Sequence, residues 1–315
     1  MRLIFFGTPE FAVPSLEALV SAGYPPLLVV SQPSRPAGRG HALKEPPVVE
    51  AARRLGLPCV QVETVRGEAF LARLRALEPE LAVVVAFGQI FRQPLLELPR
   101  QGCINVHASL LPKYRGAAPI QAAVAAGETV TGVTVQQMTR GLDAGPLLGR
   151  AELAVGPEET AEALSPRLAA LGAALLVETV GRCERGELVP EPQDESQVSF
   201  APRLERGQGE VDFELPARAI YDRWRGYTPW PGLFARLGSD PLKLLSCRLL
   251  PGSTAAAPGT VLGLVDGCLA IACGGGTILG VPRVQRPNRA AISAPELWRG
   301  EHLAGGERFS PPSAL

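Results

Sequence analysis

Long apolar runs are missing from this sequence. No stretch of about 18 or more apolar residues occurs, which argues against a membrane-spanning helix. The chain starts with a strand-like pattern over residues 2–6 and shows no signal-peptide layout, so we expect a cytoplasmic protein with no membrane association. The six cysteines are scattered without a Cys-x-x-Cys pair. We interpret them as reduced thiols and predict neither disulfides nor a bound metal.

Lysine is also scarce, so arginine carries nearly all the positive charge. Only three of the 31 basic residues are lysines, and the formal net charge is zero. From residue 216 onward, 11 Lys or Arg stand against 6 Asp or Glu, a balance of +5 that leaves −5 for the first 215 residues. A basic C-terminal part suits a polyanionic partner, and an unevenly charged solvated surface is an equal alternative. The candidate phosphate contacts there are Arg218, Arg223, Arg225, Arg283, Arg286, Arg289 and Arg299.

Strand-like and helical stretches alternate through the first 140 residues, a pattern typical of a parallel sheet covered on both faces. The clearest apolar runs lie at 2–6, 27–30, 81–86 and 103–107. We therefore predict an α/β fold with an open, mostly parallel sheet of Rossmann-like type and helices on both faces. After the first strand, Thr8 is expected to cap a helix that ends near Ser21. That turn lacks the Gly-x-Gly-x-x-Gly pattern of dinucleotide-binding proteins.

The pattern changes in the second half of the chain. A long amphipathic helix over residues 160–184 is expected to close a first domain at residues 1–188. Prolines among charges then predict a linker at 189–206. Five short strands punctuated by Gly and Pro follow, and they predict a smaller β-barrel in a second domain at 207–315.

The most informative stretch runs from Cys103 to Gly116. It places Asn105 and His107 two residues apart at the end of an apolar strand, so both side chains point to one face. Asp143 offers a carboxylate on a second, glycine-flanked loop. Amide, imidazole and carboxylate can together bind a carbonyl oxygen, move a proton and orient the base. Taken singly, each residue has a bland alternative, such as a packed histidine or a turn. Of the three histidines, only His107 lies at a strand end.

Asn105-Val106-His107, Ser109-Leu110-Leu111-Pro112 and Gly141–Gly145 resemble the signature of the folate-dependent formyltransferases. Further segments, spread over nearly the whole chain, are similar to the branch of that family that acts on methionyl-tRNA. These segments are Phe5–Ala12, Gln32–Gly40, Ala86–Ile90, Arg115–Gln121, Thr228–Pro231 and Pro258–Thr260. The resemblance implies transfer of a formyl group from 10-formyltetrahydrofolate to the α-amino group of methionine on initiator tRNA. It also implies an OB-like form for the C-terminal barrel, which would bind tRNA, and no metal.

The resemblance assigns roles to particular residues. Asn105 would hydrogen-bond the formyl oxygen, His107 would polarise the same centre or relay a proton, and Asp143 would orient His107. The folate donor is expected to lie against two segments. For Phe87, in the first of them, an ordinary place in the hydrophobic core is the alternative. The residues of these segments are Phe87, Gly88, Gln89 and Ile90, with Ser109, Leu110, Leu111 and Pro112 opposite.

The Gly- and Pro-rich segment at 31–47 carries the candidate tRNA contacts Arg35, Arg39 and Lys44. Arginine suits phosphates and unstacked RNA ends, whereas a surface loop without function is the default for this composition. The main rival function is a sugar-nucleotide formyltransferase that uses the same donor and the same three residues on a small amine. A glycinamide ribonucleotide formyltransferase and a non-catalytic RNA- or folate-binding protein are further alternatives. The loop and the basic C-terminal part favour tRNA, and we expect a monomer.

Overall fold

The computed structural model describes residues 1–37, 42–238 and 240–312, and the chain forms two compact units. Unit 1 comprises residues 1–119, 130–154 and 165–202. Unit 2 comprises residues 120–129, 155–164 and 203–315. Two short stretches that interrupt the sequence of unit 1 therefore belong with unit 2. The predicted boundaries at residues 188 and 206 stay a prediction.

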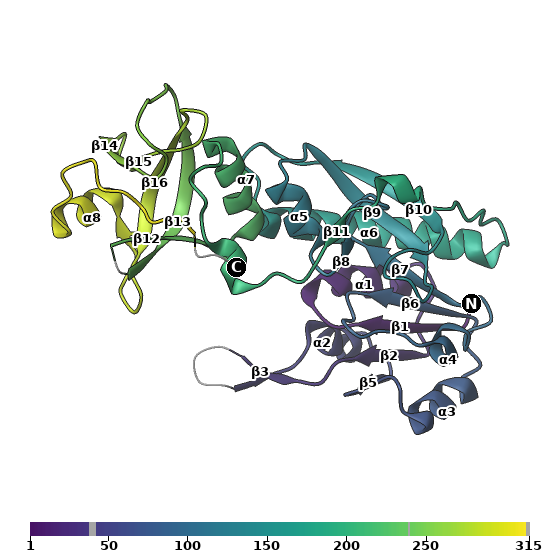
Figure 1. The fold of residues 1–315 in the computed structure, drawn as a ribbon. Helices are drawn as coiled ribbons and strands as arrows, with labels where there is room; N and C mark the ends of the chain where they lie inside the picture. Colours follow the sequence, from purple (N-terminus) through teal and green to yellow (C-terminus); the bar gives the residue numbers. More distant parts are fainter. Residues whose placement is uncertain (38–41, 239, 313–315) are drawn as a thin grey trace. The chain divides into compact units, whose positions relative to one another are not determined.

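A seven-stranded sheet forms the centre of unit 1, in the order β10-β9-β7-β6-β1-β2-β5 (Figure 1). Its first five strands in chain order are parallel to one another, β9 is antiparallel to β7, and β10 is antiparallel to β9. Every residue of β1 and β6 is buried, as expected of a parallel sheet with both faces covered. The Rossmann-like prediction is confirmed, with two antiparallel strands added at one edge. The strands are β1 (Leu3–Gly7), β2 (Leu28–Ser31), β5 (Cys59–Gln61), β6 (Leu81–Val85), β7 (Cys103–His107), β9 (Val130–Gln137) and β10 (Leu147–Ala154).

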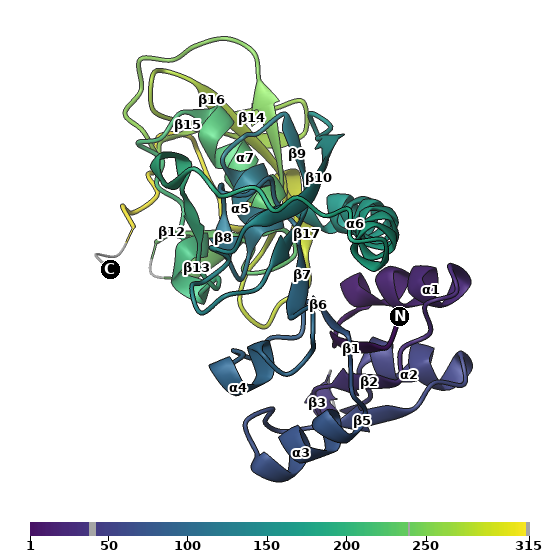
Figure 2. The same cartoon turned by 90° about the vertical axis from the view of Figure 1, so that its right-hand side faces the viewer.

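Helices cover both faces of this sheet (Figure 2). On one face, leucines of α3 and α4 pack with Ile4 and Phe6 of β1. On the other face, α6 crosses β7 and β9 at Gly172, where an added Cβ would lie 3.0 Å from a methyl group of Val106. The helical elements of this unit are η1 (Glu10–Ala12), α1 (Val13–Ser21), α2 (Pro47–Arg54), α3 (Glu68–Ala76), α4 (Gln93–Leu96) and α6 (Ala161–Glu184).

Two features of these helices bear on the sequence-based expectations. The predicted cap at Thr8 is wrong, because α1 begins at Val13 after a 3₁₀ turn, and the Thr8 hydroxyl instead donates to the carbonyl oxygen of Phe87 over 3.3 Å. By length and composition α6 could cross a membrane, and 50% of its most apolar 18-residue stretch is buried inside the protein. Packing over β7 and β9 accounts for an apolar helix of this kind in the core of a domain.

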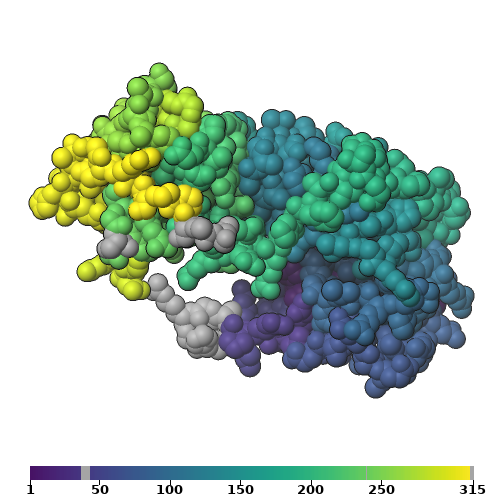
Figure 3. Space-filling model, viewed as in Figure 1, coloured from purple at the N-terminus to yellow at the C-terminus, as the bar shows by residue number. Residues whose placement is uncertain are grey.

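An antiparallel sheet, in the order β12-β13-β16-β15-β14, forms the body of unit 2. Residues 307–310 bridge its two ends: Leu237 pairs with Phe309, and Thr260 pairs with Arg308. This bridging gives the sheet its barrel-like form, as predicted. The space-filling view shows α8 and the segment after it, in yellow, on the surface of this unit (Figure 3). The elements are α5 (Pro119–Ala125), α7 (Ala217–Tyr227), β12 (Leu233–Leu237), β13 (Asp240–Leu250), β14 (Val261–Val265), β15 (Cys268–Ala272), β16 (Ile278–Gln285), β17 (Ile292–Ser293) and α8 (Ala294–Gly300).

Residues 189–202, here called the strap, belong to unit 1 although their composition is that of a linker. Glu191 pairs with Leu147 at the start of β10. Further along, β11 (Phe200–Ala201) runs parallel to β8 (Arg115–Gly116). Both contacts bring the strap to the two loops that follow β7 and β9.

Candidate active site

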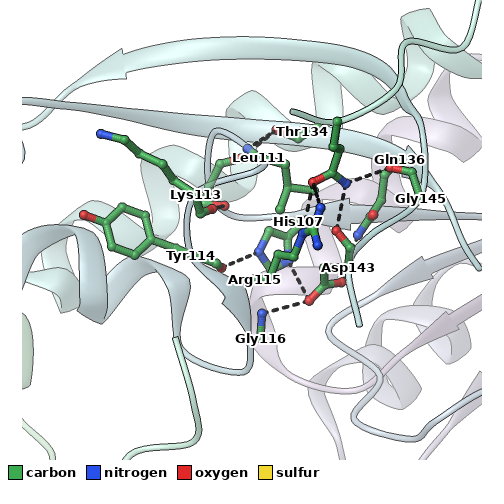
Figure 4. Close-up of polar contacts among 12 residues, drawn as sticks. His107, Leu111, Lys113, Tyr114, Arg115, Gly116, Thr134, Gln136, Asp143 and Gly145 are labelled. Carbon is green, nitrogen blue, oxygen red and sulfur yellow. Dashed lines mark hydrogen bonds and ion pairs between the residues drawn. The ribbon is translucent and has the colours of Figure 1, made fainter. Parts of the chain in front are cut away.

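His107 ends β7, and its ring is fixed between a loop carbonyl and a carboxylate. Its Nε2 lies 2.9 Å from the carbonyl oxygen of Tyr114, and its Nδ1 lies 3.7 Å from Oδ2 of Asp143 (Figure 4). Because a carbonyl oxygen can only accept, Nε2 carries the proton in the neutral ring. The lone pair of Nδ1 then faces the side of Asp143, although 3.7 Å is too long for a direct hydrogen bond.

Asn105 lies two residues earlier on β7 and is half-buried. Since successive side chains of a strand alternate, it shares a face with His107. Within the described parts of the chain its amide makes no hydrogen bond. The amide is therefore available to a ligand at the end of β7, and its binding of an oxygen remains a prediction.

Asp143 is brought to this place by a loop in which its backbone adopts a φ of +47°. The backbone N–H of Gly116 donates to Oδ2 over 2.9 Å, and Nε2 of Gln136 donates to Oδ1 over 2.8 Å. Gly116 has a φ of +124°, and a Cβ added there would lie 2.6 Å from the carbonyl oxygen of Ala201. Only glycine fits between the strap and the Asp143 carboxylate.

Sequence reasoning missed two polar residues of β9. Gln136 pairs with Asn105 and Thr134 pairs with His107 in the antiparallel register. Gln136 is 2% exposed, and its Oε1 is buried with no hydrogen-bond partner among the residues that the structure describes. The Thr134 hydroxyl donates to the carbonyl of Ser109 and accepts from the N–H of Leu111. The signal was present, because polar side chains in an otherwise buried strand require partners.

The Ser109–Pro112 segment, predicted to contact folate, uses most of its polar groups to hold its own shape. The Ser109 hydroxyl donates to the carbonyl of Lys113 over 2.6 Å, and the Leu111–Pro112 peptide bond is cis. Ser109 and Leu111 are buried, whereas Leu110 and Pro112 are partly exposed. The two partly exposed side chains are the ones in this segment that a ligand can reach directly.

The second predicted folate segment, residues 87–90, has a similar division. Phe87 is 1% exposed and its ring packs edge-on against Phe6, so its side chain occupies the core position given above as the alternative. Gly88 has a φ of +81°, and Gln89 ties the loop to the N–H of Val65. Ile90 is 73% exposed. Folate contact through these residues remains a prediction.

The candidate tRNA contacts Arg35 and Lys44 come together on a two-stranded hairpin formed by β3 (Arg35–Ala37) and β4 (Ala42–Lys44). They are direct partners in its register, and both are exposed. Arg39 lies outside the described residues. Gln32 accepts a hydrogen bond from Arg35 and donates one to the carbonyl of Phe87, which connects the hairpin to the 87–90 loop.

The described part of the chain contains no group of three or more His, Cys, Asp or Glu side chains that could hold a metal ion. The polar groups that meet at the end of β7 are an amide, an imidazole and a carboxylate. Such a set suits stabilisation of a carbonyl-derived oxyanion and movement of one proton.

Comparison with known proteins agrees with this chemistry. The family described as formyl transferase matches residues 1–180, and its C-terminal domain matches residues 203–302. A methionyl-tRNA formyltransferase from Anaeromyxobacter dehalogenans is 50% identical over 304 residues, which cover 95% of this chain and 97% of the relative. One from Acidobacterium capsulatum is 47% identical over 310 residues, covering 98% and 99%.

Solved structures share the fold at much lower identity. An N-formyltransferase from Helicobacter canadensis, in complex with folinic acid and dTDP-3-aminofucose, superposes with a TM-score of 0.66 at 16% identity and covers 91% of this chain and 99% of its own. A glycinamide ribonucleotide transformylase from Symbiobacterium toebii has a TM-score of 0.51 at 23% identity and covers 62% of this chain and 94% of its own. At these identities the likeness extends to the fold alone.

Proposed function

The chain belongs to the formyltransferase family, among the methionyl-tRNA formyltransferases, and on that premise we propose that it formylates the α-amino group of methionine on initiator tRNA with 10-formyltetrahydrofolate as donor. The similarity to methionyl-tRNA formyltransferases, at 47% and 50% identity over nearly the full length of the chain, supports methionyl-tRNA as the acceptor. The single structural observation that carries the proposal is the meeting of Asn105, His107 and Asp143 at the end of β7. A cytoplasmic monomer without metal or membrane association completes the proposal.

Each of the three groups has a step in this reaction. Asn105, whose amide is free of protein partners in the described residues, donates to the formyl oxygen as negative charge develops on it. His107 accepts the proton of the attacking amine on Nδ1, since Nε2 already donates to Tyr114. Asp143, 3.7 Å away, stabilises the resulting imidazolium. The imidazolium then returns the proton to the departing folate nitrogen, so one C–N bond forms, one breaks and the proton balances.

The donor is proposed to lie against residues 87–90 and 109–112, through the partly exposed Leu110, Pro112 and Ile90 and the backbone of the others. Loop backbone and small residues let a flat ring approach closely. Arg35, Arg39 and Lys44 are proposed to contact tRNA. The paired positions of Arg35 and Lys44 on one exposed hairpin support a joint phosphate contact.

The C-terminal unit is proposed to add further phosphate contacts, through fewer arginines than the charge count implies. Arg225 is 1% exposed and is bound by Asp222, so its prediction as a phosphate contact is wrong. Arg218 shares Asp222, and Arg286 is paired with Glu301. Arg223 is partly exposed and donates to the carbonyl of Gln208 over 3.0 Å. Arg218, Arg223 and Arg286 are therefore set aside because their guanidinium groups have partners within the unit, and the exposed Arg283, Arg289 and Arg299 stay in the proposal.

A formyl-transfer assay that offers methionyl-initiator tRNA and a dTDP-amino sugar in parallel tests the proposal. We expect formylation of the tRNA and at most a trace with the sugar. Preferential formylation of the sugar would instead favour the rival function, whose fold is shared. Omission of the folate donor is the control for both reactions.

A further inference from the structure

We propose that Gln193 of the strap, held by Arg115, is a positioning residue that sets the backbone of Asp143. Gln193 donates from Nε2 to the carbonyl oxygen of Asp143 over 2.8 Å and to that of Gly145 over 2.7 Å. Its Oε1 accepts from Nη2 of Arg115 over 2.8 Å and from Nε over 3.1 Å. These three partners, Arg115, Asp143 and Gly145, lie close together in Figure 4. The catalytic consequence rests on the proposed function, whereas the positioning does not.

The two hydrogen bonds to the loop carbonyls bear on the part of the site that most needs support. Asp143 holds a φ of +47°, a conformation that side chains other than glycine adopt at a cost. The carboxylate must nevertheless lie beside Nδ1 of His107. The two hydrogen bonds from Gln193 to the carbonyls at positions 143 and 145 stabilise the loop in this conformation without contacting the carboxylate.

Arg115 makes Gln193 a fixed clamp. Arg115 is 4% exposed, so its guanidinium cannot exchange these partners freely for water. It also pairs with Glu195 of the strap over 2.7 Å, but the Glu195 side chain is 71% exposed and adds little. Both Nε and Nη2 of Arg115 donate to Oε1 of Gln193. The amide oxygen is therefore held toward Arg115, and the amide nitrogen faces the loop.

Only an amide can serve both sides of this arrangement. The Asp143 and Gly145 carbonyls accept and need donors, whereas Arg115 donates and needs an acceptor. Glutamate would keep the acceptor and lose both donors. The chemistry therefore selects glutamine at position 193, on a segment whose proline- and charge-rich sequence is typical of a linker.

Three variants test the inference. In Gln193→Met, which keeps the length and removes both donors and the acceptor, we expect kcat to fall about tenfold or more with KM for folate within about twofold. In Gln193→Glu, which keeps the contact with Arg115, kcat should fall at least as far. The control is Gln197→Met on the same strap, because Gln197 donates only to the neighbouring Asp194 in the described residues. It should keep wild-type kcat.

A double-mutant comparison separates positioning from general stability. If Gln193 acts through Asp143, Gln193→Met should cost no further activity in an Asp143→Asn background. Fully multiplicative losses in the double variant would overturn the inference. A wild-type kcat in both single variants, Gln193→Met and Gln193→Glu, would also overturn it.

A readout without activity keeps this test independent of the proposed function. The Gly116 N–H donates to Asp143 Oδ2, so its hydrogen exchange reports the place of the carboxylate. We expect about tenfold faster exchange at Gly116 in Gln193→Met, and unchanged exchange in the buried strand β6. Unchanged exchange at Gly116 refutes the positioning role whether or not the protein formylates tRNA, and absent formylation in the wild type refutes only the proposed function.

Discussion

The side chain of Gln136 donates a hydrogen bond to the carboxylate of Asp143 over 2.8 Å. Gln136 is also the strand partner of Asn105, so one buried amide lies next to two of the three candidate catalytic groups. The carboxylate therefore has two protein donors, from β9 and from the loop after β7. Its geometry depends on strand register as well as on the loop that carries it.

Removal of this donor should affect turnover more than stability. In Gln136→Met we expect kcat to fall by about 10- to 100-fold, because a hydrogen bond to a charged group is removed next to the reacting proton. Gln137→Met is the matched control: the same change one residue along, on the opposite face, where the side chain donates to the carbonyl of Gln101. Steady-state kinetics and thermal unfolding of both variants decide. Equal kcat in the two would remove Gln136 from the site.

Loss of the oxygen-binding amide should be more severe. For Asn105→Ala we expect a fall in kcat of roughly two orders of magnitude or more, as is found when an oxyanion donor is removed. Because this amide makes no hydrogen bond within the described chain, the variant should unfold at nearly the wild-type temperature. Folate binding measured by calorimetry gives the control. A turnover near that of wild type would show that another group stabilises the oxygen.

Much of the fold could be predicted, because apolar strands buried on both faces are visible as unbroken runs. Cys103–His107 is an example: β7 begins and ends at the predicted residues. β10 was missed because it is an edge strand whose exposed positions alternate, with Gly149 in its middle, where a Cβ would lie 3.2 Å from Leu175. The α8 helix was missed although Ser293 and Glu296 form a capping box at its start.

Of the candidate site, the placing of the three central residues together was predictable, whereas the residues that support them were not. Asn105 and His107 follow from strand alternation. Gln136 and Gln193 reach Asp143 through register and through the path of the strap, and neither is encoded in local sequence spacing. Arg225 shows the same limit, since nothing in an arginine-rich helix says which arginine is buried, except the Asp222 three residues before it.

The buried thiols should make stability depend on pH in alkaline solution. Burial raises the pKa of the Cys103 thiol from its ordinary 9.0 to about 12. The unfolded chain therefore loses this proton first, and the stabilising contribution, complete below about pH 9, is lost as the pH rises toward 12. We expect the free energy of unfolding to fall over this range, and to fall less in Cys103→Ala. Urea titrations at pH 8 and 10.5 measure this fall. An equal fall in the free energy of unfolding for the wild type and Cys103→Ala would contradict the role of the Cys103 thiol.

Arg225 should matter for stability and not for RNA. Its guanidinium donates to Asp222 over 2.6 Å and to the carbonyls of Gly156 and Glu159. Arg225→Ala leaves the Asp222 carboxylate buried without its main partner, which costs about 3–5 kcal/mol in comparable pairs. Arg299→Ala, at an exposed position, should change stability by less than about 0.5 kcal/mol. Urea unfolding distinguishes them. A stable Arg225→Ala protein with weakened tRNA binding would restore Arg225 as a phosphate contact.

The exposed arginines of the C-terminal unit should act in the opposite way. Arg283→Glu combined with Arg299→Glu should leave folding and folate affinity unchanged, because both side chains are exposed. If both bind phosphates, tRNA affinity should fall, and the slope of log affinity against log salt should flatten by about 0.7 to 0.9 for each phosphate that the variant no longer neutralises. Arg73→Glu, a single charge reversal at an exposed position on α3 of unit 1, is the control. Filter binding over a range of salt concentrations gives both quantities. A folded double variant with the affinity and slope of the Arg73→Glu control would exclude both arginines from tRNA binding. Arg289 and the hairpin of Arg35 and Lys44 would then be the basic positions to test next.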